Sequence, residues 1–161
     1  MKNIFNLLLL TFCIYTPTFA QKQMPNVTIK TDSNKSVNVK NDFKEKDKIY
    51  VFAFWATWCA PCLNELDAIN EKYAAWSKEL NMEVVAVSID DARTQKRVKP
   101  LLNGKKWPYT VLLDTNQDLK RALSIVNVPY TIVVKNQKIV HIHNGYSQGA
   151  EQELYEKLKQ L

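Results

Sequence analysis

The sequence predicts an α/β fold, a three-layer sandwich in which a central mixed β-sheet carries helices on both faces. Two near-continuous apolar runs, Ile49–Trp55 and 84–89, are typical of strands that are buried on both sides. Between them, over residues 59–80, the apolar positions fall at helical spacing. Residues 131–135 and 138–143 flank a short Asn-Gln turn and predict a hairpin. Strand–helix–strand units followed by a hairpin and a last helix are expected to form such a covered sheet.

The amino-terminal residues differ from the rest of the chain. Lys2 precedes an apolar run over residues 4–15, and small residues lead up to Ala20, which is the layout of a secretory signal peptide. The run of about 12 residues is shorter than the ~20 that a membrane-spanning helix needs. We therefore expect 1–20 to be a signal peptide cleaved after Ala20, with an uncleaved membrane anchor as the alternative. Residues 21–161 are expected to form one domain.

The other elements follow from shorter patterns. Apolar alternation predicts three further strands, at 27–31, 37–39 and 109–113. Helical spacing predicts three further helices, at 92–102, 118–124 and 149–161. Pro100 is expected to cut the first of these helices.

Composition and charge exclude some classes of function. The chain has 161 residues and is 46% hydrophobic, which is enough for a folded core. Its 3 glycines form no Gly-rich loop that could hold phosphates, which argues against nucleotide binding. The net charge is +6, or 21 − 16 = +5 without Lys2, and is weak evidence for an acidic partner. The basic stretch 93–106 has no aromatic residue suited to base stacking between its cations, so we expect a solvated helix face and no nucleic-acid partner.

The number and spacing of the cysteines limit the kinds of site that they can form. Removal of the leader would remove Cys13 and leave only Cys59 and Cys62. A bridge that closes so short a loop constrains the unfolded chain very little, so a structural disulfide is a poor explanation. A structural zinc site usually takes four Cys or His ligands, and only His141 and His143 are available, both expected on the outward face of a late strand. A redox pair beside a βαβ pattern is therefore preferred, and a metal-carrying protein is kept as an alternative.

The motif FWATWCAPC at 54–62 is followed later in the chain by NVPYTIVV at 127–134 and then by the hairpin. This combination resembles the thioredoxin superfamily, and most of all the exported TlpA/ResA-like thiol–disulfide oxidoreductases, over almost all of 25–161. The resemblance implies a thioredoxin-like domain at 21–161 with extra N-terminal strands and a central strand–helix insert. It also implies a redox-active Cys59–Cys62 disulfide whose chemistry needs no bound cofactor.

The redox motif assigns different roles to its two cysteines. Cys59 is the expected nucleophile, because the start of a helix stabilises a thiolate. Pro61 suits an early helix position, where its missing N–H has no intrahelical partner to lose. Cys62, one turn further on, is expected to be the thiol that resolves a mixed disulfide. Because neither Ala60 nor Pro61 supplies a cation, we expect a potential at the reducing end of the known scale.

Proton transfer is expected at Glu65, which follows Cys62 at a spacing that places both on one helical face. By the resemblance, Glu65 would move protons to or from Cys62; an ordinary exposed glutamate is the alternative. Two positions depart from the family pattern. Ala53 stands where thioredoxin has a buried aspartate, so Glu65 or water would have to accept the proton. Asp67 stands where the family commonly has a proline that kinks the first helix, which leaves that kink unpredicted.

Substrate contacts are expected around Cys59. Pro129 is expected to be a cis-proline, with a plain trans turn as the alternative. By the resemblance, Pro129 packs against the disulfide and the backbone of Val128 pairs with a bound substrate strand. Trp58 and Pro61 are expected to surround Cys59 with apolar surface on which a partner protein docks.

Together these features predict an exported thiol–disulfide oxidoreductase of the bacterial periplasm or envelope, acting as a monomer and as a reductant. Electrons would come from a membrane thiol donor and pass to oxidised protein substrates, by resemblance an apocytochrome c. A disulfide-forming oxidant of the same fold and a copper or zinc carrier that uses the cysteines are alternatives. A peroxide-reducing enzyme is a further one, but its Pro-x-x-x-Thr-x-x-Cys setting is missing around Cys59.

Overall fold

The structure is a computed structural model that describes residues 22–161, so the expected signal peptide at 1–20 lies outside it. The strands are β1 (Thr28–Thr31), β2 (Ser36–Asn38), β3 (Ile49–Trp55), β4 (Met82–Ser88), β5 (Thr110–Leu113), β6 (Tyr130–Lys135) and β7 (Lys138–Asn144). The helices are α1 (Ala60–Leu80), α2 (Val98–Lys105), α3 (Asp118–Ala122) and α4 (Ala150–Leu158), and a 3₁₀ turn, η1 (Gln95–Arg97), leads into α2.

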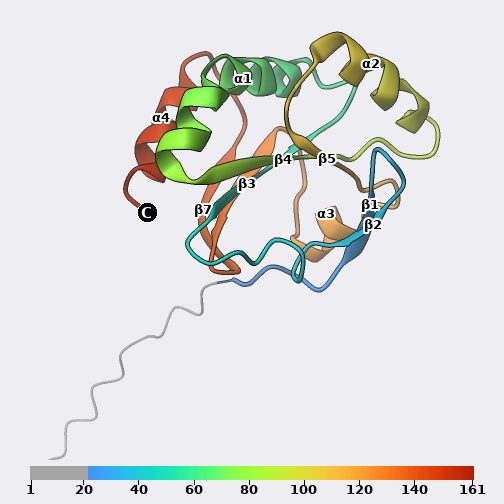
Figure 1. Cartoon of the computed structure of the whole chain (residues 1–161). Helices are drawn as coiled ribbons and strands as arrows, with labels where there is room; N and C mark the ends of the chain where they lie inside the picture. Colours follow the sequence, from blue (N-terminus) through green and yellow to red (C-terminus); the bar gives the residue numbers. More distant parts are fainter. Residues whose placement is uncertain (1–21) are drawn as a thin grey trace, which may run out of the picture.

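One 7-stranded sheet organises the molecule, in the order β2-β1-β5-β4-β3-β6-β7. The three central strands β5, β4 and β3 are parallel, and the pairs on either side are antiparallel. Helices α1 and α4 lie together on one face of the sheet and α3 lies on the other (Figure 1). The predicted three-layer sandwich is therefore confirmed, with β1 and β2 as the extra N-terminal strands.

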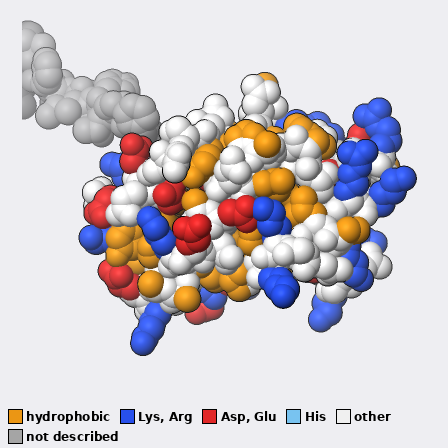
Figure 2. All heavy atoms as spheres, turned by 90° about the horizontal axis from the view of Figure 1, so that it is seen from above, with side chains coloured by type: hydrophobic (Ala, Val, Ile, Leu, Met, Phe, Trp, Pro, Cys, Tyr) orange, Lys and Arg blue, Asp and Glu red, His pale blue; other side chains and the backbone are white. Residues whose placement is uncertain are grey.

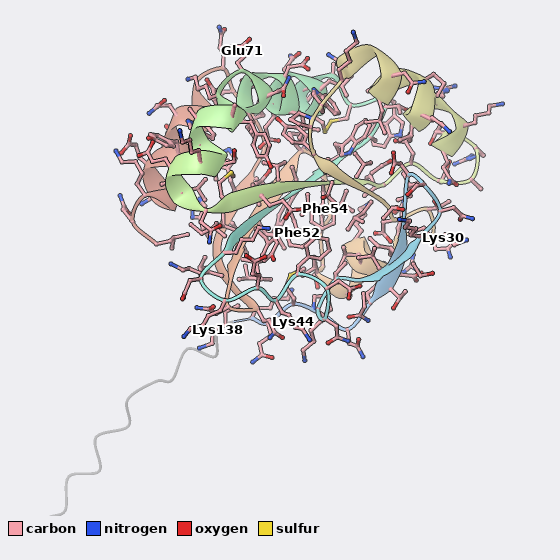
Figure 3. All side chains as sticks on the ribbon, viewed as in Figure 1. Lys30, Lys44, Phe52, Phe54, Glu71 and Lys138 are labelled. Carbon is pink, nitrogen blue, oxygen red and sulfur yellow. A yellow bond between two sulfur atoms is a disulfide. The ribbon has the colours of Figure 1, made fainter. Side chains whose placement is uncertain are left out.

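Strand β3 forms the centre of the core because all of its residues are apolar and buried. Phe52 and Phe54 are two positions apart, so they point to the same face of the sheet, and both lie inside the molecule (Figure 3). The labelled charged residues Lys44 and Lys138 extend from the rim in the same view. The carboxyl end of this rigid strand leads directly into the redox motif and thereby positions it.

The expectation that Pro100 cuts a helix at 92–102 is wrong. Helix α2 begins at Val98, and Pro100 lies within its first turn. The first backbone N–H groups of a helix have no intrahelical acceptor, so a proline there removes no hydrogen bond. The preceding segment forms the short turn η1 instead of an α-helix. Pro100 is thus part of a helix start.

The basic stretch forms a solvent-facing surface around α2. Its exposed cations are Arg93, Lys96, Arg97, Lys99 and Lys106. Lys and Arg side chains gather at the end of the molecule where α2 lies (Figure 2). The exposure of these side chains agrees with the predicted solvated helix face.

The described chain starts at one edge of the sheet. Gln23 pairs with Lys138 of β7, and the amide of Met24 donates to the carbonyl oxygen of Gln137 over 3.1 Å. These contacts cover the end of β7 that lies beside the β6–β7 turn. Within residues 22–161, no helix combines the length and apolar character that crossing a membrane requires.

Candidate active site

Cys59 and Cys62 are joined in a disulfide at the start of α1, with their Cα atoms 5.3 Å apart. Cys59 is the residue that precedes the helix, and its carbonyl accepts a hydrogen bond from the amide of Leu63 over 3.2 Å. Pro61 is the second helical residue, a position where no helical hydrogen bond is lost. Cys59 is 5% exposed and Cys62 is fully buried. A partner protein can therefore reach the Cys59 sulfur more easily than the Cys62 sulfur.

The surface beside Cys59 is partly apolar. Trp58 is 58% exposed, which is unusual for so large an apolar side chain, and Pro61 is also exposed. A groove of about 430 Å³ begins at Pro61 and runs between α1 and the loop that leads into α4. It is lined by Pro61, Asn64, Asp67, Ala68, Glu71, Tyr146, Ser147, Gln148 and Glu151. A second cleft, of about 440 Å³, lies between β1 and the β5–α3 turn and has no lining residue from the redox motif.

The peptide bond between Val128 and Pro129 is cis, as predicted. Tyr130, the next residue, pairs with Phe54 near the carboxyl end of β3. The cis peptide thus lies at the same edge of the sheet as the disulfide. The Pro129 carbonyl accepts a hydrogen bond from the amide of Gly145 over 2.9 Å, which ties this turn to the end of β7. Val128 is half-buried and keeps part of its surface toward solvent.

Glu65 is buried, with 4% of its surface exposed, so the alternative of an ordinary exposed glutamate is wrong. Burial disfavours the ionised carboxylate and raises the pKa of Glu65 from 4.5 to about 7. The hydroxyl of Thr131 donates to the Glu65 carboxylate over 2.9 Å, and this hydrogen bond lowers the pKa by a smaller amount. Thr131 pairs across the sheet with Ala53. The carboxyl group of Glu65 therefore reaches from α1 to β6. Its partner Thr131 stands opposite Ala53, the position at which thioredoxin has a buried aspartate.

Asp67 connects α1 to the end of α2 and to the segment between α2 and β5. Its carboxylate accepts a hydrogen bond from the indole N–H of Trp107 over 2.9 Å and forms an ion pair with Lys105. The Trp107 ring packs edge-on against Trp55, with 5.4 Å between ring centroids. Helix α1 runs from Ala60 through Asp67 to Leu80 as a single element. Where the family commonly has a proline, this chain therefore has an aspartate that binds Lys105 and Trp107.

Asp90 was missed by the sequence analysis. It is 1% exposed, and its carboxylate accepts hydrogen bonds from the backbone and the hydroxyl of Thr57, two residues before Cys59. The available signal was an acid that directly follows the apolar run of β4. The carboxyl ends of parallel strands share one edge of the sheet, so such a residue falls beside the redox motif.

Cys59, Cys62, His141 and His143 do not come together as a zinc site among the described residues. His141 and His143 pair with Val133 and Thr131 of β6. Among residues 22–161, no three His, Cys, Asp or Glu side chains gather in a group that could hold a metal ion.

The elements that surround the disulfide match those of known proteins. The model of the AhpC/TSA family matches residues 20–143. The thiol–disulfide oxidoreductase ResA of Bacillus thuringiensis subsp. konkukian is 28% identical over 142 residues, which cover 87% of this chain and 77% of that protein. The thioredoxin-like protein YneN of Bacillus subtilis is 25% identical over 134 residues, which cover 82% of this chain and 75% of that protein.

Solved structures agree with these relatives. The solution structure of a thioredoxin-like protein from Porphyromonas gingivalis is 42% identical, covers 86% of this chain and 90% of its own, and superposes with a TM-score of 0.75. StoA from Bacillus subtilis covers 82% of this chain and 99% of its own with a TM-score of 0.64, and at 20% identity it supports the fold alone. The chain therefore belongs to the AhpC/TSA family and is a TlpA/ResA-like thiol–disulfide oxidoreductase of the thioredoxin superfamily.

Proposed function

We propose that the chain reduces disulfides in exported protein substrates through the Cys59–Cys62 pair. The observation that supports this best is the arrangement of the two sulfurs at the start of α1. Cys59 has some solvent-accessible surface and follows the exposed Trp58, whereas Cys62 is fully buried. An outer thiol at a helix N-terminus is suited to attack a partner's disulfide, and an inner thiol is suited to resolve the product.

Each turn of the proposed reaction transfers two electrons. In the reduced chain, the Cys59 thiolate attacks one sulfur of a substrate disulfide, and the other sulfur leaves and takes up a proton. Cys62 then gives its proton to Glu65 and attacks the Cys59 sulfur of the mixed disulfide. The substrate leaves with its second sulfur as a thiol once that sulfur is protonated. One substrate disulfide becomes two thiols, and Cys59 and Cys62 become a disulfide.

The surrounding residues are proposed to hold the substrate. Trp58 and Pro61 would supply the apolar contact beside Cys59, and the groove that begins at Pro61 offers room for a polypeptide segment. The backbone of Val128 would pair with an extended substrate strand, next to the cis-peptide bond to Pro129.

The direction of electron flow is tested by the redox potential. We expect a potential closer to the roughly −270 mV of thioredoxin than to the roughly −120 mV of DsbA, because neither Ala60 nor Pro61 provides a cation that would stabilise the Cys59 thiolate. The chain would be equilibrated with reduced and oxidised dithiothreitol at several ratios, and its free thiols counted by alkylation.

A variant of the same motif provides the control. Pro61→His introduces a group that can carry a positive charge beside Cys59, and we expect it to move the potential toward the oxidising end. A wild-type potential near that of DsbA would contradict the reductant assignment and favour the oxidant alternative.

The wider setting of the reaction is also a proposal. By family resemblance, the electron donor would be a membrane thiol carrier and the substrate an apocytochrome c, and the chain would act as a monomer in the periplasm or envelope. The peroxide-reducing alternative gains no support, because Phe52 and Ala56 occupy the two positions where that motif needs Pro and Thr.

A further inference from the structure

The carboxylate of Asp90 lies at the junction between β4 and the redox motif. One oxygen accepts a hydrogen bond from the Thr57 hydroxyl over 2.7 Å, and the other accepts from the Thr57 amide over 2.8 Å and from the Ser88 hydroxyl over 2.9 Å. All three groups are donors, which suits an ionised carboxylate because it can only accept. The side chain is 1% exposed, so water does not compete for these bonds.

The turn over residues 56–59 is held at several points. The amide of Ile89 donates to the carbonyl of Trp55 over 2.8 Å, and the amide of Cys59 donates to the carbonyl of Ala56 over 3.0 Å. Thr57 lies between these two bonds, and both its backbone amide and its hydroxyl donate to the Asp90 carboxylate. Asp90 therefore fixes the middle of the turn that carries Cys59.

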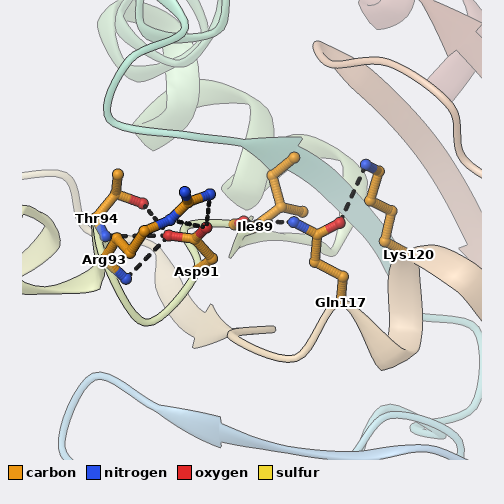
Figure 4. A network of polar contacts seen from close by, with 6 residues as sticks. All are labelled: Ile89, Asp91, Arg93, Thr94, Gln117 and Lys120. Carbon is orange, nitrogen blue, oxygen red and sulfur yellow. Dashed lines mark hydrogen bonds and ion pairs between the residues drawn. The ribbon is translucent and has the colours of Figure 1, made fainter.

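Asp90 is itself anchored on both sides. Its amide donates to the Ser88 hydroxyl over 3.1 Å. The next residue, Asp91, binds Arg93 and Thr94, and the carbonyl of the preceding Ile89 accepts a hydrogen bond from Gln117 (Figure 4). The segment that presents the Asp90 carboxylate is thus held by contacts to residues other than Cys59 and Cys62.

We propose that Asp90 is a positioning residue for disulfide exchange, which holds Cys59 next to Cys62 when the disulfide is open. The inference rests on the proposed redox function of this pair. Two thiols that are held close together form a disulfide more readily than two thiols on a loose turn. This positioning shifts the equilibrium between dithiol and disulfide toward the disulfide.

The test is the equilibrium with dithiothreitol. In this reaction the Cys59–Cys62 disulfide gains two electrons and two protons, and one dithiothreitol becomes its cyclic disulfide. We expect Asp90→Asn to shift the equilibrium constant toward the dithiol by up to about tenfold, because the hydrogen bonds of Asp90 count only to the extent that they are stronger in the disulfide form than in the dithiol form. Thr57→Val removes only the hydrogen bond from the hydroxyl and keeps those from the backbone amide and from Ser88, so it should shift the constant by a smaller factor in the same direction.

Two control variants separate positioning from general destabilisation. Thr57→Ser keeps the hydroxyl and should keep the wild-type constant. Asp114 is buried to the same 1%, but its carboxylate accepts from the amides of Leu119 and Lys120 in α3 and, within residues 22–161, has no hydrogen bond to the turn. Asp114→Asn should therefore leave the constant unchanged, even where it lowers the unfolding temperature.

The outcomes are distinct. The inference would be overturned if the equilibrium constant with dithiothreitol were the same for Asp90→Asn, Thr57→Val and Asp114→Asn. A shift of Asp90→Asn and Thr57→Val toward the disulfide would also overturn it. If Asp90→Asn does not fold, the comparison of Thr57→Val with Thr57→Ser decides the question. A wild-type chain that never equilibrates with dithiothreitol would overturn the redox function itself, and the inference with it.

Discussion

Cys59→Ser will reduce disulfide exchange to the uncatalysed rate, whereas Cys62→Ser will leave a chain that attacks a disulfide and stays attached to it. The reason is that the thiolate is the attacking species, and a serine hydroxyl does not ionise at neutral pH. In Cys62→Ser the mixed disulfide on Cys59 has lost the thiol that would resolve it. The rate is measured as dithiothreitol-driven reduction of a disulfide protein such as insulin. Trapping is measured separately, with reduced variant from which dithiothreitol has been removed, because that reagent would cleave the mixed disulfide. Non-reducing electrophoresis then detects the trapped species.

The two variants are controls for each other, because each removes one sulfur and both abolish the disulfide. Loss of the internal disulfide alone would therefore affect both in the same way. If Cys59→Ser traps a partner and Cys62→Ser does not, the two roles are reversed. Exchange at the wild-type rate in either variant would contradict the mechanism. A partner recovered from Cys62→Ser in the native cell would also identify the substrate.

Glu65→Gln will make the folded chain more stable at alkaline pH and leave its stability almost unchanged near pH 4. The pKa of Glu65 is about 7 in the folded chain and about 4.5 in the unfolded chain, so the folded state holds the proton more tightly. In the wild type this contribution to stability is fully present below pH 4.5 and is lost as the pH rises to 7 and above. The pKa difference corresponds to roughly 3 kcal/mol above pH 8. A glutamine side chain does not ionise, so the variant does not lose stability in this way as the pH rises.

Urea unfolding of the oxidised chain at pH 4 and pH 8 measures the effect. Glu71→Gln, on an exposed position of the same helix, is the matched control and should leave the pH dependence unchanged. In the reduced chain, Glu65→Gln should slow resolution of the mixed disulfide above pH 7 by about a hundredfold, as expected for the loss of a general base. Wild-type and Glu65→Gln curves that stay parallel from pH 4 to pH 8 would show that Glu65 does not titrate in this range.

The buried elements could be predicted from the sequence because their own residues determine them. Strand β3 has the limits predicted, Ile49–Trp55, since a strand with both faces covered must be apolar at every position. Helix α1 follows from its apolar spacing in the same way. Helix α2 was placed too early, because a proline in the first turn of a helix and a proline that interrupts one look alike in the sequence.

The polar contacts of the site could be predicted only in part. The motif locates the cysteines, Glu65 and Pro129, but helical spacing does not say which donor stands opposite Glu65. Thr131 lies 66 positions away along the chain, on a strand whose register depends on the whole sheet. Asp90 and Thr57 are separated by 33 positions, and their contact requires two chain segments to end at the same edge. Such pairs are created by the fold and have no local signature.

The first described residues of the chain lie at the opposite end of the domain from Cys59. Gln23 joins β7 beside the turn after Lys135, and Lys135 pairs with Ile49 at the beginning of β3. Cys59 follows the other end of that strand, about 20 Å away for a strand of this length. A domain fastened by its amino end would therefore point its sulfurs away from the point of attachment. The body of the fold would act as a spacer, and partners could approach the disulfide from the open side.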